Sequence, residues 1–109
     1  MEKLIDMVKK GQTTLIPPFP DYVDARVLAA TVAETITPPA AASVIALCAT
    51  DDCWVDPSGT AVVPSTDVTD GTAAFLLPAG VWMYLVLSGQ TSCSIISEAA
   101  AKVSIMYYA

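Results

Sequence analysis

Short apolar runs separated by turn-forming residues recur along the chain from residue 26 onward. From Val27 to Ile36 successive side chains fall into two alternating sets, which is typical of a β-strand. Similar runs, each bounded by Gly, Pro, Asp or small polar residues, occupy residues 43–49, 53–55, 60–63, 73–77, 81–87, 92–96 and 103–107. The pattern predicts an all-β domain, a single antiparallel β-sandwich or jelly roll of about eight short strands. Residues 97–102 have the composition of one helical turn, which does not change this class.

The first 25 residues follow a different pattern. Between Glu2 and Lys10 the spacing of apolar residues predicts a short amphipathic helix, and Gly11 suits its C-terminal end. The segment Pro17-Pro18-Phe19-Pro20 fits neither a helix nor a central strand, because proline fixes φ and lacks an N–H group. We therefore predict an extended N-terminal arm carrying a short helix over residues 1–25, followed by a β-sandwich domain over residues 26–109.

An arm of this kind has little to stabilise it on a free monomer, since a helix this short is marginal in water. We expect it to lie on another protein chain, because its own net charge is zero and its useful groups are apolar. The residues predicted to bind this partner are Leu4, Ile5, Val8, Leu15, Ile16, Pro17, Pro18, Phe19, Pro20 and Tyr22.

The composition also indicates contacts with other chains. Hydrophobic residues make up 54% of the 109 residues and charged residues 15%, against roughly 25% charged in ordinary domains. A small domain cannot bury so many apolar groups internally, so we expect a homo-oligomer, either a dimer or a trimer. The residues predicted for self-association are Trp82, Tyr84, Tyr107 and Tyr108. The same aromatic side chains, with Trp54, are also candidates for stacking on sugars or bases.

Charge and chain breaks argue against two other kinds of partner. Residues 27–109 carry one lysine against seven acidic residues, which accounts for the whole net charge of −6. Nucleic-acid binding needs basic groups against phosphates, so it is not expected. The uncharged stretch from Thr72 to Ser97 is interrupted by turn residues at 78–80 and 88–90. A membrane-spanning helix needs about 20 consecutive apolar residues, so no membrane span is expected either.

Few residues in the chain could support catalysis or bind a phosphate or a metal ion. The chain contains no histidine, which excludes Ser-His-Asp and Cys-His catalysis, and it has neither of the common glycine-rich phosphate-binding motifs. Acidic residues gather in two predicted loops, Asp51-Asp52 with Asp56, and Asp67 with Asp70. Aspartate is favoured in turns because its side chain accepts bonds from the local backbone, and we prefer this interpretation. Calcium ligation and a carboxylate pair for glycoside hydrolysis are the alternatives. No enzyme activity, cofactor or metal site is predicted.

The three cysteines, Cys48, Cys53 and Cys93, are interpreted as small buried hydrophobic residues, with a Cys48–Cys53 disulfide as the minority alternative. The segment 1–10 has mixed charges and lacks the apolar core of a signal peptide. Synthesis in a cytoplasm is therefore expected.

Residues 36–108 resemble a recurrent type of small bacteriophage virion protein. The resemblance is carried by Ala49-Thr50-Asp51-Asp52-Cys53-Trp54-Val55, by Asp70-Gly71-Thr72 with Leu77-Pro78-Ala79-Gly80, by residues 92–97 and by the final segment 100–108. Proteins that look like this are often capsid cement or decoration proteins, small β-sandwiches or jelly rolls that bind the outer shell across capsomer boundaries. Others belong to the tail or neck.

The resemblance implies a non-enzymatic phage structural protein, most directly a capsid cement or decoration protein. Its partner would be the major capsid protein, and it would be synthesised in the host cytoplasm and located in the virion, at the capsid surface. Two alternatives remain open. One is a carbohydrate- or receptor-binding β-sandwich of a tail or fibre, and the other is a head–tail or tail structural component.

Overall fold

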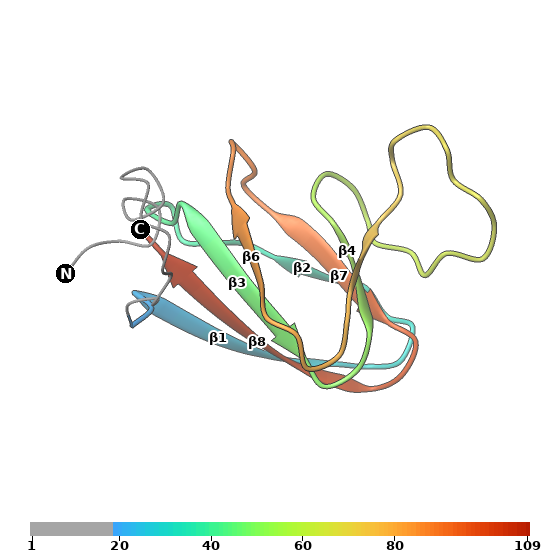
Figure 1. Ribbon diagram of the computed structural model, residues 1–109, viewed down its shortest axis with the longest axis horizontal. Coiled ribbons are helices and arrows are strands. Elements are labelled where there is room, and N and C mark those ends of the chain that lie inside the picture. Colours follow the sequence, from blue (N-terminus) through green and yellow to red (C-terminus); the bar gives the residue numbers. More distant parts are fainter. Residues whose placement is uncertain (1–18) are drawn as a thin grey trace.

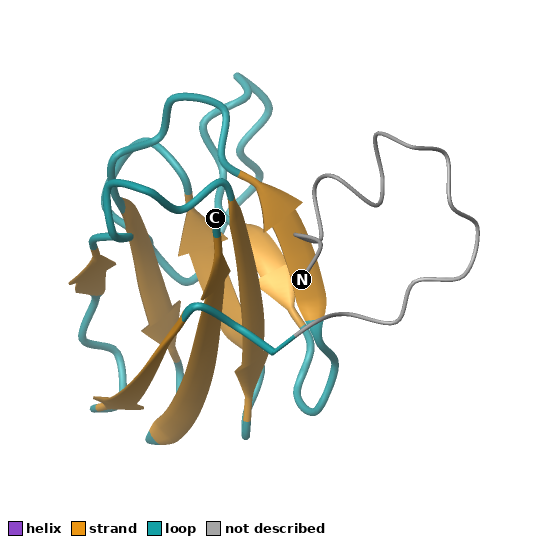
Figure 2. Cartoon of the chain, turned by 90° about the vertical axis from the view of Figure 1, so that its left-hand side faces the viewer, coloured by secondary structure: helices purple, strands orange, loops and turns teal. Residues whose placement is uncertain are grey.

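The computed structural model describes residues 19–109, which form two antiparallel sheets packed face to face (Figure 1). Among these residues there are strands and loops but no helix (Figure 2), so the all-β prediction is confirmed. The strands are β1 (Tyr22–Leu28), β2 (Glu34–Ile36), β3 (Val44–Ala49), β4 (Cys53–Asp56), β5 (Phe75–Leu77), β6 (Met83–Val86), β7 (Cys93–Ser97) and β8 (Ala101–Tyr108).

The two sheets have four strands each. Sheet A has the order β1-β8-β3-β6 and sheet B the order β2-β7-β4-β5. Apart from the β4–β5 connection, every link between consecutive strands crosses from one sheet to the other. The strand edges are therefore β1 and β6 in sheet A, and β2 and β5 in sheet B.

The hydrophobic core lies between the sheets and is built by period-two alternation. On β8 the inward residues Val103, Ile105 and Tyr107 are buried, and the outward Lys102 and Ser104 are exposed. The other fully buried large residues of the core are Leu28, Ile36, Ile45, Leu47, Val55, Leu77 and Ile95. They come from both sheets, so neither sheet can bury its apolar face without the other.

Three local predictions are corrected. The predicted strand Val27–Ile36 is two strands, because the chain turns at Thr31, which has a φ of 58°. This turn is held by a hydrogen bond from the Thr31 N–H to the Ser97 carbonyl (2.7 Å), a contact that the local sequence does not reveal. Residues 60–63 form no strand, and residues 97–102 form no helical turn, since β8 already begins at Ala101.

The N-terminal boundary can be described from Phe19 onward. The Asp21 N–H donates to the Tyr107 carbonyl (2.9 Å), and β1 begins at Tyr22, within the segment assigned to the arm. The predicted helix over residues 2–10 and the prolines at 17 and 18 lie outside the described residues. The division at residue 25 remains a prediction.

Candidate functional site

The outer face of sheet A is apolar across all four strands. Alternation places Val23 and Val27 of β1 on this face, 57% and 71% exposed. The other outward strand residues are Ala25, Val44, Ala46, Cys48, Tyr84, Val86, Lys102, Ser104, Met106 and Tyr108. Lys102 is the one charged side chain in this set. Large apolar patches without charge are typical of interaction sites, because exposing them to water is unfavourable.

A smaller cluster lies on the two central strands at one end of this face, where β3 begins and β8 ends. Tyr108 is buried here with Val44 and Ala46, and Met106 packs against them. The ring of Tyr84 lies beside the ring of Tyr108, with centroids 6.4 Å apart. Burial and the neighbouring Tyr84 raise the pKa of the Tyr108 hydroxyl, so the group stays neutral. This end of the face is therefore packed and uncharged.

The outer face of sheet B differs because its own chain covers part of it. The loop between β4 and β5 passes over this face, where the Ala61 N–H donates to Ser94 Oγ (2.9 Å) and Ala61 is buried. The loop starts at Asp56, whose carboxylate accepts hydrogen bonds from the N–H groups of Ser58 (3.0 Å) and Gly59 (2.9 Å). Sheet A therefore presents the more accessible apolar face.

The two open sides of the sandwich also differ. Between β1 and β2, Arg26 Nη1 lies 3.2 Å from Glu34 Oε1, and the Tyr107 hydroxyl donates to Asp24 Oδ2 (3.1 Å). Burial, followed by the bond to Asp24, strongly raises the pKa of Tyr107. These polar contacts close this side of the core.

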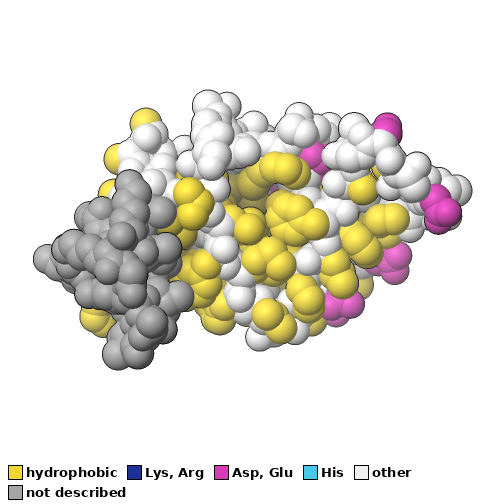
Figure 3. Space-filling view, turned by 45° about the horizontal axis from the view of Figure 1, so that its top comes forward, with side chains coloured by type: hydrophobic (Ala, Val, Ile, Leu, Met, Phe, Trp, Pro, Cys, Tyr) yellow, Lys and Arg dark blue, Asp and Glu magenta, His cyan; other side chains and the backbone are white. Residues whose placement is uncertain are grey.

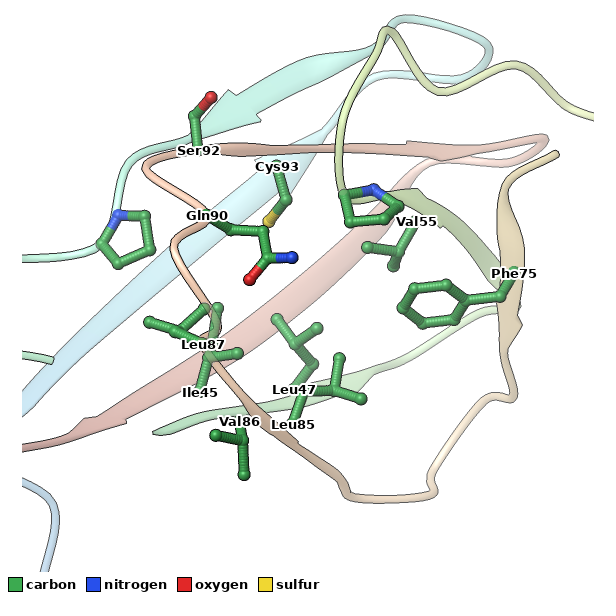
Figure 4. A pocket seen from close by; sticks show the side chains of 12 residues that line it. Ile45, Leu47, Val55, Phe75, Leu85, Val86, Leu87, Gln90, Ser92 and Cys93 are labelled. Atoms are coloured by element: carbon green, nitrogen blue, oxygen red, sulfur yellow. The ribbon is translucent and has the colours of Figure 1, made fainter. Parts of the chain in front are cut away.

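The opposite side, between β6 and β5, contains an apolar cavity of about 200 Å³. Figure 4 shows Phe75 and Cys93 pointing toward Leu47 and Leu85 across it, with Val86 directed away. In a view onto this side, Figure 3 shows apolar side chains gathered around a hollow, with acidic side chains toward one end. The sandwich is thus closed by charged groups on one side and left open and apolar on the other.

The residues predicted for self-association fall in two environments. Trp82 and Tyr84 lie at the surface beside or on β6, each 42% exposed. Tyr107 points into the core and Tyr108 outward, as expected for adjacent strand residues, and both are buried. The structure therefore brings Trp82 and Tyr84 to the accessible surface, but not the two C-terminal tyrosines.

Most residues predicted for the arm cannot be placed. Leu4, Ile5, Val8, Leu15, Ile16, Pro17 and Pro18 lie outside the described residues. Phe19 is exposed, Pro20 is partly buried, and Tyr22 belongs to β1, with its ring 5.9 Å from that of Tyr107. Val23, Val27 and Val86 are surface residues that were not predicted from the sequence. The alternation Val23-Ala25-Val27 was a usable signal, but residues 23–25 had been assigned to the arm and Val27 to the strand that follows it.

The acidic loops show turn chemistry. Besides the Asp56 bonds, Asp70 Oδ1 accepts hydrogen bonds from the N–H and the hydroxyl of Thr72, at 3.1 and 2.6 Å. These bonds lower the pKa of Asp70, because they favour the charged carboxylate. Within residues 19–109, no three acidic or cysteine side chains gather as a group that could hold a metal ion.

All three cysteines are free thiols. Cys48 points outward from sheet A, whereas Cys53 is buried in the core on sheet B. Burial raises the pKa of Cys53 and of Cys93, which disfavours the reactive thiolate form. Cys53 is a buried core residue, as predicted, and Cys93 is half-buried against the core. Cys48 was also predicted to be buried, but it is half-buried on the outer face of sheet A.

An open groove of about 500 Å³ lies beside Trp54 at the end of sheet B where β4 begins and β7 ends, with Asp51, Asp52 and Glu98 along it. Asp52 Oδ1 is partly engaged, since it accepts a hydrogen bond from the Ala79 N–H (2.8 Å). A partly exposed indole next to carboxylates is an arrangement suited to sugar rings and their hydroxyl groups.

No helix in residues 19–109 has the length and apolar character needed to cross a membrane. Comparisons of the chain with protein-family models, with curated proteins and with solved structures find no significant match. The surfaces described above are therefore the basis on which a function can be proposed.

Proposed function

We propose that this chain is a non-enzymatic structural protein of a bacteriophage particle, a capsid cement that binds neighbouring major capsid subunits. The observation that supports this most directly is the outer face of sheet A, where Val23 and Val27 are largely exposed on a strand surface with one charge. A surface of this kind is stabilised when another protein covers it.

The arm adds a second contact in this proposal. Residues 1–18 precede the first described residue and contain Leu4, Ile5, Leu15 and Ile16. Two weak contacts on one chain bind together more tightly than either alone, with avidity gains of about a hundredfold. A cement protein that binds several capsid subunits is therefore expected to use both contacts, the arm and the outer face of sheet A.

The test uses purified full-length protein and empty shells of the phage's major capsid protein. Val23→Asp places a charge on the exposed face of sheet A, and we expect it to weaken shell binding at least about tenfold. Val62→Asp is the matched control, since Val62 is 66% exposed and Val23 57%, but Val62 lies in the β4–β5 loop. Equal binding by both variants, or no binding by the wild type, would count against the proposal.

Carbohydrate binding at a tail or fibre is the second candidate, favoured by the groove beside Trp54. A glycan array with the isolated protein distinguishes it from the first. Glycan binding that Trp54→Ala abolishes and Val23→Asp preserves would support this function instead.

A further inference from the structure

The four sheet edges of the molecule are protected to different degrees. Exposed strand edges invite pairing with other chains, and proteins block this with inward-pointing charges or very short strands. The β1 and β2 edges carry the Arg26–Glu34 pair, and β5 is three residues long. The β6 edge has no charged residue, because residues 71–97 are uncharged throughout. Within the described strands, β6 is thus the least protected edge.

The backbone of β6 has a defined free side. The Leu87 N–H donates to the Ser43 carbonyl (2.8 Å), continuing the register in which Leu85 lies opposite Ile45. In an antiparallel ladder the hydrogen-bonding residues alternate, so odd-numbered residues of β6 face β3. The N–H and C=O groups of Tyr84 and Val86 therefore point to the open edge.

The side chains around this edge are apolar and accessible. Trp82, Tyr84 and Val86 are all exposed, and they continue the outer face of sheet A up to its border. Val81, just before them in the chain, is exposed as well. Burying side chains of this kind stabilises an edge contact beyond its backbone hydrogen bonds.

The charge distribution permits a second copy of this chain at the β6 edge more readily than elsewhere on the surface. Residues 19–109 carry two basic and nine acidic residues, so two copies repel each other over most of their surfaces. The β6 edge brings no acidic residue of one copy against the same edge of another. A second copy is also complementary in register, since a two-fold axis at Leu85 places Tyr84 opposite Val86 of the second copy. Aromatic and β-branched residues form favourable cross-strand pairs.

We propose that two copies of this chain associate by antiparallel pairing of their β6 strands about a two-fold axis at Leu85, forming one continuous eight-stranded sheet from the two copies of sheet A. The hydrogen-bonded pairs are Tyr84 with Val86 of the second copy, and the reverse. The apolar outer faces of both sheets then form one surface. This inference is independent of the proposed function, because it requires no capsid.

The first experiment measures association of the full-length protein by analytical ultracentrifugation. Val86→Lys adds a charge at the paired edge, and we expect it to raise the dimer dissociation constant at least about tenfold. Val27→Lys is the matched control, since it lies on the same face of sheet A at the opposite edge strand. We expect it to leave the dimer intact. Circular dichroism spectra and melting temperatures of both variants confirm that each is folded.

The second experiment tests the register. Leu85 on the two-fold axis is a non-hydrogen-bonded pair, where opposite Cα atoms lie about 4.5 Å apart, within disulfide range. Leu85→Cys should form an intermolecular disulfide under mild oxidation much faster than Val27→Cys or the wild type. A monomeric or trimeric wild type, a Val86→Lys variant that still dimerises, or equal cross-linking of both cysteine variants would each overturn the proposal.

Discussion

At the scale of single residues, Tyr107 on the last strand, β8, holds the first strand, β1. Its side chain is buried between the sheets, and its hydroxyl donates to Asp24 of β1. The backbone carbonyl of the same residue accepts the Asp21 N–H. One residue of β8 therefore holds the first strand by its side chain and its backbone, which explains why a tyrosine occupies a core position.

This contact predicts a pH dependence. The folded-state pKa of Tyr107 lies above the unfolded value of about 10, so the neutral hydroxyl is favoured in the fold. Its contribution to the free energy of unfolding is complete below that unfolded value and is lost as the pH rises through and above it. Tyr107→Phe should therefore lower the free energy of unfolding by about 1 kcal/mol at neutral pH. The free energy of unfolding of this variant should decrease less between neutral and alkaline pH than that of the wild type.

Urea unfolding at pH 7 and at about pH 11 measures both effects. Tyr22→Phe, which changes an exposed tyrosine of the paired strand, is the control. If Tyr107→Phe and the wild type lose equal stability on going to the higher pH, the buried hydroxyl is not the alkali-sensitive group.

At the scale of elements, β1 decides where the folded domain begins. The strand runs from Tyr22 to Leu28, and each of its residues has a partner on β8. The sequence had assigned residues 22–25 to the arm because of the proline-rich segment before them. Residues 22–25 all pair with β8, and the Tyr107 hydroxyl donates to Asp24, so these four residues are part of sheet A.

Two truncations test whether residues 22–25 act as part of the arm or as part of β1. Removing residues 1–18 leaves all eight strands intact, and we expect a cooperative unfolding transition close to that of the full chain. Removing residues 1–25 takes away more than half of β1 and the Asp24–Tyr107 bond. We expect a loss of several kcal/mol or failure to fold. Thermal unfolding followed by circular dichroism measures both. Equal stability of the two truncations would contradict the role assigned to β1.

At the scale of the whole molecule, the distribution of charge controls association. The net charge is −6, while residues 71–97, which include β5, β6 and β7, carry none. Copies that meet at β6 still repel each other through the acidic groups elsewhere on their surfaces. The attraction at the proposed interface is apolar, so salt screens the repulsion without weakening the contact.

The β6 dimer should therefore become tighter as salt is added. The screening length falls from about 10 Å in 0.1 M salt to about 3 Å in 1 M salt. We expect the dissociation constant measured by sedimentation to decrease over this range, with the Val86→Lys variant remaining the weaker dimer. A dissociation constant that rises with salt would indicate that charge pairs hold the copies together.

Much of the fold could be predicted because its signals are local. The predicted apolar runs overlap all eight strands at least in part, although the run 27–36 merges the end of β1 with β2. Pro78-Ala79-Gly80 was correctly interpreted as a turn, with Gly80 at a φ of 73°. The turn interpretation was correct for Asp56 and Asp70, which bond residues two or three positions away. Asp52 instead accepts a hydrogen bond from Ala79, which is distant in the sequence. The turn at Thr31 was missed because its bond partner, Ser97, is distant in the sequence.

The sequence by itself determined the all-β class, the turns that are held by local bonds and the absence of histidine chemistry, since these depend on side-chain type and on residues near each other in the chain. Only the tertiary structure decided which strands share a sheet, that Tyr107 and Tyr108 are both buried, and that β6 is an edge. Strand pairing depends on burying apolar faces from distant segments together, and period-two alternation is the same whichever strand lies alongside. The sequence therefore contains the alternation of apolar residues, whereas the order of the strands decides that the outer face of sheet A and the β6 edge are exposed.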